Sequence, residues 1–124
     1  MDREPAKRFE DLVVWQKSHE LTLRVYRITK TFPREELFGL TSQMRRAAVS
    51  VAANIAEGFS KRGRADKARF MNTAQGSLEE LRYYFILAAD LAYVTDKHRP
   101  AEIDNVARLL GAYTRSLLAP PPTP

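Results

Sequence analysis

Residues 64–94 read RADKARFMNTAQGSLEELRYYFILAADLAYV, and this stretch decides the fold class. Its apolar side chains recur three and four positions apart, which is the spacing of one face of an α-helix. They are Met71, Ala74, Leu78, Leu81, Phe85 and Ala88. The stretch is therefore predicted to be one amphipathic helix, ~45 Å long at ~1.5 Å per residue.

Two stripes with the same spacing precede this helix. The first runs from Val14 to Phe32, and Pro33 ends it because the proline ring disfavours helical geometry at the preceding residue. The second covers residues 42–57 and is rich in alanine, which allows a close approach of a neighbouring helix. Its predicted terminator is Gly58, in the left-handed conformation that glycine adopts readily.

A fourth stripe follows Pro100, which fits the first turn of a helix because its missing N–H has no partner there. The second helix is expected to be capped by the hydroxyl of Thr41 or Ser42. Short connections make consecutive helices antiparallel neighbours. We expect an all-α domain over residues 9–118, a flexible segment at 1–8, and a proline-rich disordered tail at 119–124.

Composition narrows the class of protein. The chain has 124 residues, enough for one domain, and contains no cysteine, which excludes disulfides, thiolate nucleophiles and cysteine zinc sites. The first seven residues, MDREPAK, lack the apolar core of a signal peptide. The longest low-charge stretch, residues 47–56, is far shorter than the ~20 residues of a membrane span. The expectation is a soluble, basic, cytoplasmic domain.

Positive charge is concentrated in one part of the chain. Residues 42–69 contain seven cations against Glu57 and Asp66, which equals the net charge of +5 for the whole protein. The cations are Lys61, Arg62, Arg64, Lys67, Arg69, Arg45 and Arg46. The first five surround the predicted turn between the second and third helices and would form one basic end that attracts phosphate backbones. The alternative is a solvated turn without a ligand.

The two remaining arginines have a structural interpretation as well. A hairpin folded about Lys61 places residues 45–46 opposite residues 76–77, one turn from two glutamates. The favoured reading is an ion pair between helices, beside a close contact that Gly76 permits, and phosphate binding is the minority reading. The expected pair is Arg46 with Glu80 or Arg45 with Glu79.

The same counting places polar side chains against one another between these helices. Ser50 is expected to face Asn72, and Asn54 is expected to lie near Ala68. Buried polar groups need hydrogen-bond partners, so these contacts would fix the helix register.

Catalytic constellations are sparse. The only histidines are His19 and His98, and no Glu-x-x-His pair of the kind used in di-iron bundles is present. The acid pairs at residues 35–36 and 79–80 are adjacent in sequence, and neighbours on a helix diverge by ~100°, so neither pair forms a dyad. Gly58 and Gly63 lack the surroundings of a phosphate loop. We expect no enzymatic activity, no metal and no cofactor.

Aromatic residues exceed what one core can take. Tyr83, Tyr84 and Phe85 are consecutive and cover most of a helix circumference, while Val13 and Trp15 stand beside the first stripe. Surplus apolar surface on a small bundle is commonly an interface, which favours self-association. The alternative is partial shielding by loops and the tail.

Several of these segments together are familiar. These segments are Asp11-Leu12-Val13-Val14-Trp15-Gln16, Phe32-Pro33, the run from Gly39 to Ala48 (GLTSQMRRAA), Ser50, Asn54-Ile55-Ala56-Glu57-Gly58, Arg69-Phe70 and Gly76-Ser77-Leu78-Glu79-Glu80-Leu81. In this order they resemble the bacterial 23S rRNA intervening-sequence protein family, from about Phe9 to Leu118. The resemblance implies an up-and-down, left-handed four-helix bundle and a homopentamer. It implies no catalytic residues, and the molecular role of the family is poorly established.

Two functions follow as hypotheses. The first is a non-enzymatic homo-oligomer whose basic end binds RNA or DNA through phosphates, with little base readout. The second is a protein-interaction scaffold or accessory subunit without direct nucleic-acid contact, whose charge only steers approach.

Overall fold

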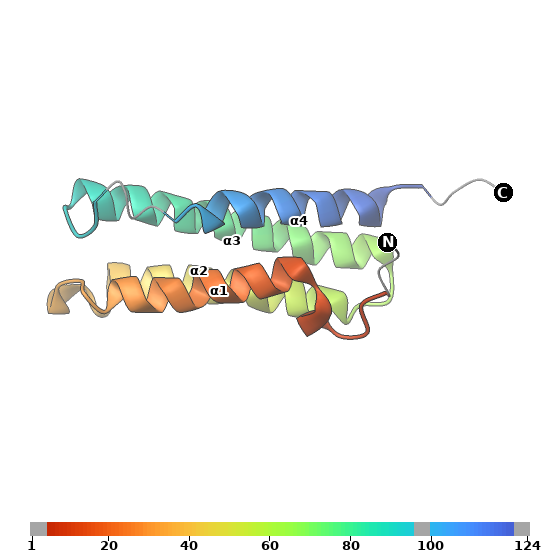
Figure 1. Ribbon diagram of the computed structural model, residues 1–124, viewed down its shortest axis with the longest axis horizontal. Coiled ribbons are helices and arrows are strands. Elements are labelled where there is room, and N and C mark those ends of the chain that lie inside the picture. Colours follow the sequence, from red (N-terminus) through yellow and green to blue (C-terminus); the bar gives the residue numbers. More distant parts are fainter. Residues whose placement is uncertain (1–4, 96–99, 121–124) are drawn as a thin grey trace.

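The computed structural model describes residues 5–95 and 100–120. In chain order the elements are η1 (Phe9–Asp11), α1 (Val13–Thr29), η2 (Arg34–Glu36), α2 (Leu40–Phe59), α3 (Arg64–Asp90) and α4 (Glu102–Leu118). Figure 1 shows α1 beside α2 and α3 beside α4, with each helix antiparallel to the next. Within the described ranges there is no strand. The predicted all-α, antiparallel four-helix bundle is confirmed.

The predicted terminal segments lie only partly within this description. Residues 1–4 of the N-terminal segment and 121–124 of the tail are outside the described residues, as is His98.

The predicted stripes form the core. The six residues of the α3 stripe are each at most 1% exposed, and Val25 of α1 and Ile55 of α2 are fully buried. The one polar member of the α1 stripe, Ser18, donates a hydrogen bond to the carbonyl of Val14, one turn earlier, at 2.7 Å. This bond satisfies the hydroxyl locally, so a serine is accommodated inside the bundle.

The α2 helix begins earlier than predicted, and a different group caps it. The backbone N–H of Leu40 donates to the carboxylate of Glu36 at 3.1 Å. Thr41 is a buried residue inside the helix, so the prediction of a hydroxyl cap from Thr41 or Ser42 is wrong. A carboxylate from the preceding 3-10 turn supplies the acceptor instead.

The end of α2 also differs, because Gly58 lies inside the helix and has no left-handed conformation. A Cβ atom built on it would lie 2.6 Å from both Met71 Cε and Phe70 Cβ of α3. Glycine is needed at this position for the close approach of two helices, and the predicted role as terminator is wrong.

Polar contacts set the register of α2 against α3. The hydroxyls of Ser50 and Ser77 are 2.8 Å apart, and Asn54 Nδ2 donates to the Ser50 carbonyl at 2.8 Å. Asn72 is exposed, so its predicted pairing with Ser50 is wrong. Backbone hydrogen bonding continues past the end of α2, where the Lys61 N–H donates to the Gly58 carbonyl at 3.1 Å. The chain therefore reverses after Lys61, the residue about which the hairpin was assumed to fold.

The α3 helix ends at Asp90, four residues before the predicted end. Ala92 has a φ of 63°, and Tyr93 N–H donates to the Ala88 carbonyl at 2.9 Å, which turns the chain out of the helix. The Tyr93 hydroxyl donates to Glu36 at 2.8 Å, and this bond raises the pKa of Tyr93 above its ordinary value. Pro100 lies two residues before α4, so it is not in the first turn as predicted, and its carbonyl accepts the N–H of Ile103 at 3.1 Å.

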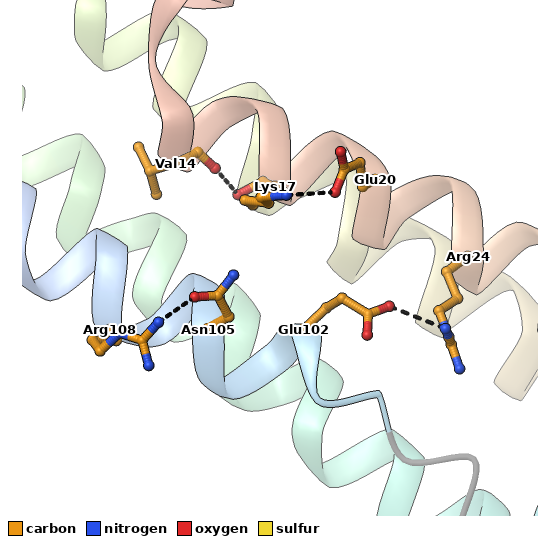
Figure 2. Close-up of polar contacts among 8 residues, drawn as sticks. Val14, Lys17, Glu20, Arg24, Glu102, Asn105 and Arg108 are labelled. Carbon is orange, nitrogen blue, oxygen red and sulfur yellow. Dashed lines mark hydrogen bonds and ion pairs between the residues drawn. The ribbon is translucent and has the colours of Figure 1, made fainter.

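The contact between α1 and α4 closes the bundle. Figure 2 shows Arg24 of α1 and Glu102 of α4 reaching each other across the two helices, at 3.3 Å. The neighbouring Lys17–Glu20 pair stays within α1. Fewer residues of α1 and α4 approach each other than of α2 and α3, so the bundle is tightest around α2 and α3.

Candidate nucleic-acid interface

Five of the predicted cations gather at the α2–α3 turn. We call them the basic end: Lys61, Arg62, Arg64, Lys67 and Arg69. The three arginines are exposed and the two lysines are half-buried. Figure 1 shows this turn at the same end of the bundle as the last turn of α4. Arg64 Nη1 donates to the Ala119 carbonyl at 3.5 Å, which links the turn to the residue after α4.

Two phenylalanines position the lysines. Lys67 Nζ donates to the Phe59 carbonyl and lies 4.8 Å from the centre of the Phe59 ring. Lys61 Nζ lies 5.0 Å from the centre of the Phe70 ring, and the Arg69 guanidinium lies 5.6 Å from the same ring. These contacts hold the cations near the ring faces and satisfy a carbonyl at the end of α2.

The sequence reasoning missed the two rings, although a local signal was present. Phe59 lies two residues before Lys61, and Phe70 directly follows Arg69. Aromatic residues at both edges of a cationic turn are the pattern to look for.

The positive charge of the basic end is weakly compensated. Asp66 forms an ion pair with Arg69 at 3.0 Å, in which both side chains are more than half exposed. Exposed pairs of this kind contribute ~0–1 kcal/mol, so the arginine can exchange its partner for a phosphate at little cost. Arg62 is exposed and has no ion-pair partner within residues 5–95 and 100–120.

Arg45 and Arg46 lie elsewhere, in the first half of α2. About fifteen residues at ~1.5 Å per residue separate them from the turn, or ~22 Å. Arg45 Nε donates to Thr29 Oγ1 at 2.9 Å, and its guanidinium lies 4.6 Å from the centre of the Tyr26 ring. The structure therefore does not bring all seven predicted residues into one patch.

The predicted ion pairs of these arginines with α3 are wrong. In the described part of the chain, Glu79 pairs with Arg82 at 3.1 Å, and Glu80 accepts the Tyr84 hydroxyl at 3.1 Å. Burial and this hydrogen bond raise the pKa of Tyr84. The later chain reversal shifts the α2–α3 register, which removes the assumed alignment. Gly76 permits no close contact either, because no atom lies within 4 Å of the place of its Cβ.

Comparison with known proteins decides the family. The family model described as 23S rRNA-intervening sequence protein matches residues 10–112. The chain belongs to the 23S rRNA-intervening sequence protein family. A crystal structure of a protein of unknown function from the S23 ribosomal protein family of Bacteroides thetaiotaomicron VPI-5482 has the same fold. It is 24% identical, with a TM-score of 0.62, over 86% of this chain and 95% of that chain. Among curated proteins there is no match.

The acidic pairs of this family member have structural contacts. Glu36 caps α2 and accepts the Tyr93 hydroxyl, while Glu79 holds Arg82, whose pKa is raised chiefly by its hydrogen bond to Asp104. Across the described residues no three metal-ligating side chains form a group. Nor does any described helix have the length and apolar character to cross a membrane.

His19, the one histidine in the described residues, stacks on Trp15 with ring centres 5.1 Å apart. Trp15 also meets Phe9 of η1 at 5.0 Å, so the N-terminal turn shields this part of the surplus aromatic surface. On α3, Phe85 is buried in the core while Tyr83 is 56% exposed. The three consecutive aromatics thus point to different surroundings, as predicted.

A second surface feature was absent from the sequence reasoning. An open hollow of ≈ 650 Å³ lies between α1, the η2 region and the first half of α2. We call it the α1–α2 groove, and its lining residues are Tyr26, Leu37, Phe38, Thr41, Ser42, Arg45, Arg46, Val49 and Ser50. Phe38 is 91% exposed. Two arginines line the groove and none of its lining residues carries a carboxylate.

Proposed function

We propose that this chain is a non-enzymatic, homo-oligomeric cytoplasmic protein that binds the phosphate backbone of RNA or DNA through its basic end. The observation that carries the proposal is the gathering of five cations against one carboxylate at a single turn. Lysine and arginine at this density engage phosphates and release counterions.

Sequence-independent binding fits the composition of the basic end. Residues 59–70 read FSKRGRADKARF and contain no asparagine or glutamine, the side chains that pair with adenine edges. Contacts to phosphate fix position on the nucleic acid but carry no base information. Binding is therefore expected to vary little with nucleotide sequence, apart from arginine contacts to guanine edges.

Self-association supports the same function. The family resemblance implies five copies, each with its own basic end. Contacts that are weak singly add through a high effective concentration when several copies engage one strand. Native mass spectrometry of the purified protein is expected to show a multiple of the 14.2 kDa chain.

Filter binding to RNA and to duplex DNA over a salt series tests the nucleic-acid contact. Five engaged phosphates predict a slope of roughly −4 in a plot of log affinity against log salt. Replacing Arg62 and Arg64 by alanine should reduce the slope by about 2, since each phosphate contact contributes about 1. The matched control replaces Arg27 and Lys30, two exposed cations at the far end of α1, and should leave the slope unchanged.

Two results would count against the proposal. One is undetectable binding at low salt or a flat salt series. The other is an equal loss of slope in the Arg27 and Lys30 control, which would show only a response to net charge.

A protein-interaction scaffold is the second candidate, and the α1–α2 groove favours it because exposed apolar surface lines a concave site. In that case reversing the charges of Arg62, Arg64 and Lys67 would spare co-purification of the protein partner. Under the first proposal the same variant loses nucleic acid.

A further inference from the structure

The α1–α2 groove has a complementary surface on another helix of the same chain. Five exposed residues of α3 lie on the outward side of the helix. Four of them are spaced four, three and four positions apart, and the fifth is three positions before Tyr83, which places all five on neighbouring parts of the helix surface. We call them the α3 ridge: Glu79, Glu80, Tyr83, Ile86 and Asp90. Tyr83 is 56% exposed and Ile86 is 45% exposed.

The two surfaces match in chemistry. The groove combines exposed apolar side chains with two arginines, whereas the ridge combines exposed apolar side chains with three carboxylates. Opposite charges around an apolar centre are the usual composition of a specific protein interface. Glu79 is partly compensated by Arg82, so Glu80 and Asp90 are the principal acidic groups of the ridge.

The two surfaces also lie at the same level along the bundle. The groove occupies the first half of α2, and the ridge occupies the last third of α3. Because α2 and α3 are antiparallel, these parts are at the same end, away from the basic end (Figure 1). The bond between Tyr93 and Glu36 joins the chain following α3 to the η2 segment there.

We propose that the α3 ridge of one copy docks in the α1–α2 groove of a second copy. The contact is head-to-tail, because each copy offers a different surface to each of two neighbours. The equal level of groove and ridge lets successive copies stand side by side with their helices aligned, which suits a closed ring. The basic ends would then share one side of the ring. This inference rests on the homo-oligomer of the proposed function and assigns its interface.

Two single substitutions test the pairing. Phe38→Glu places a carboxylate in the groove, and Tyr83→Arg places a guanidinium on the ridge. Both residues are more than half exposed, so the fold should survive, which circular dichroism checks. Leu118→Glu is the matched control, since Leu118 is 62% exposed on α4 and belongs to neither surface.

The readout is native mass spectrometry of each purified variant and of an equimolar mixture. Phe38→Glu alone and Tyr83→Arg alone should each fall to the mass of a single chain, while Leu118→Glu should assemble as the wild type does. The mixture should give a heterodimer that grows no further, because it holds one intact groove and one intact ridge.

Three results would overturn the inference. If either variant assembles like the wild type, that surface is not at the interface. If the mixture stays monomeric while the wild type assembles, the contact is not head-to-tail between these surfaces. In both cases the proposed homo-oligomer survives with another interface. A wild-type protein that stays a monomer would refute both the interface and the homo-oligomer, and would leave the groove to a different protein partner; filter binding judges the nucleic-acid contact separately.

Discussion

The α2–α3 contact and the α1–α4 contact are built by different means. Between α2 and α3, Gly58 removes a side chain where Met71 and Phe70 come close, and Ser50 meets Ser77 through a short hydrogen bond. Between α1 and α4, a half-buried ion pair from Arg24 to Glu102 spans the helices (Figure 2).

The two contacts are expected to differ in how well they tolerate amino-acid substitution. Close packing has no room for an added methyl group, because interiors are filled to crystal-like density. A partly solvated ion pair contributes little to stability and is screened by salt. In addition, Arg24 Nε is enclosed without a hydrogen-bond partner among the described residues, which reduces the benefit of the pair. We therefore expect the α2–α3 contact to be intolerant of substitution and the α1–α4 contact to be permissive.

The largest expected effect is at Gly58. Gly58→Ala should lower the free energy of unfolding by about 1–3 kcal/mol, because the new Cβ overlaps Phe70 Cβ, which cannot move without the α3 backbone. Urea denaturation measures the change.

Gly76→Ala is the matched control for that variant. Gly76 is also inside a helix but faces open space, so alanine should raise stability by about 0.5–1 kcal/mol. Equal effects at the two glycines would contradict the close-packing explanation.

A smaller effect is expected at the α1–α4 ion pair. Glu102→Gln should lower the free energy of unfolding by at most ~1 kcal/mol at low salt, and the difference should shrink toward zero in ~1 M salt. Denaturation at several salt concentrations measures it. Glu20→Gln, which breaks a pair inside α1, is the control and should cost less than ~0.5 kcal/mol. A loss at Glu102 that is independent of salt would show that packing dominates this contact too.

The smallest effect is confined to alkaline pH. Tyr113 of α4 lines a hollow with Leu12 and Val14, and burial raises its pKa above the ordinary value. The unfolded chain therefore loses the hydroxyl proton of Tyr113 at a lower pH than the folded chain does. The stability contributed by this shift is fully present below pH ~10 and is lost as the pH rises through the folded-state pKa. The wild type should therefore lose stability more steeply than Tyr113→Phe above pH ~10, as measured by denaturation at graded pH. Parallel curves would remove this role from Tyr113.

The helices and their core follow from local periodicity, which the sequence displays directly. The α3 stripe from Met71 to Ala88 is buried as predicted because a repeat of three and four admits one buried face. The basic end was also predicted from local sequence, since its five cations lie within nine residues around one turn.

Contacts between helices were not predictable in the same way. The pairing of Ser50 with Ser77 depends on where the turn reverses, and a shift of a few residues changes every partner across the two helices. Glu36 meets Tyr93, which is 57 residues away in sequence, and neither residue carries a local sign of the other. The α1–α2 groove likewise arises only when α1 and α2 are placed side by side.

The backbone conformation of Ala92, where the chain leaves α3, is strained. A φ of 63° is unfavourable for a residue with a Cβ, at ~1–2 kcal/mol, and is readily adopted by glycine. Most folds put glycine at such a helix exit, so this bundle accepts a local strain that one substitution would relieve. The burial of Phe85 and Ala88 in the preceding turns must outweigh that strain, which means that this exit is less stable than the same fold with glycine at position 92 would be.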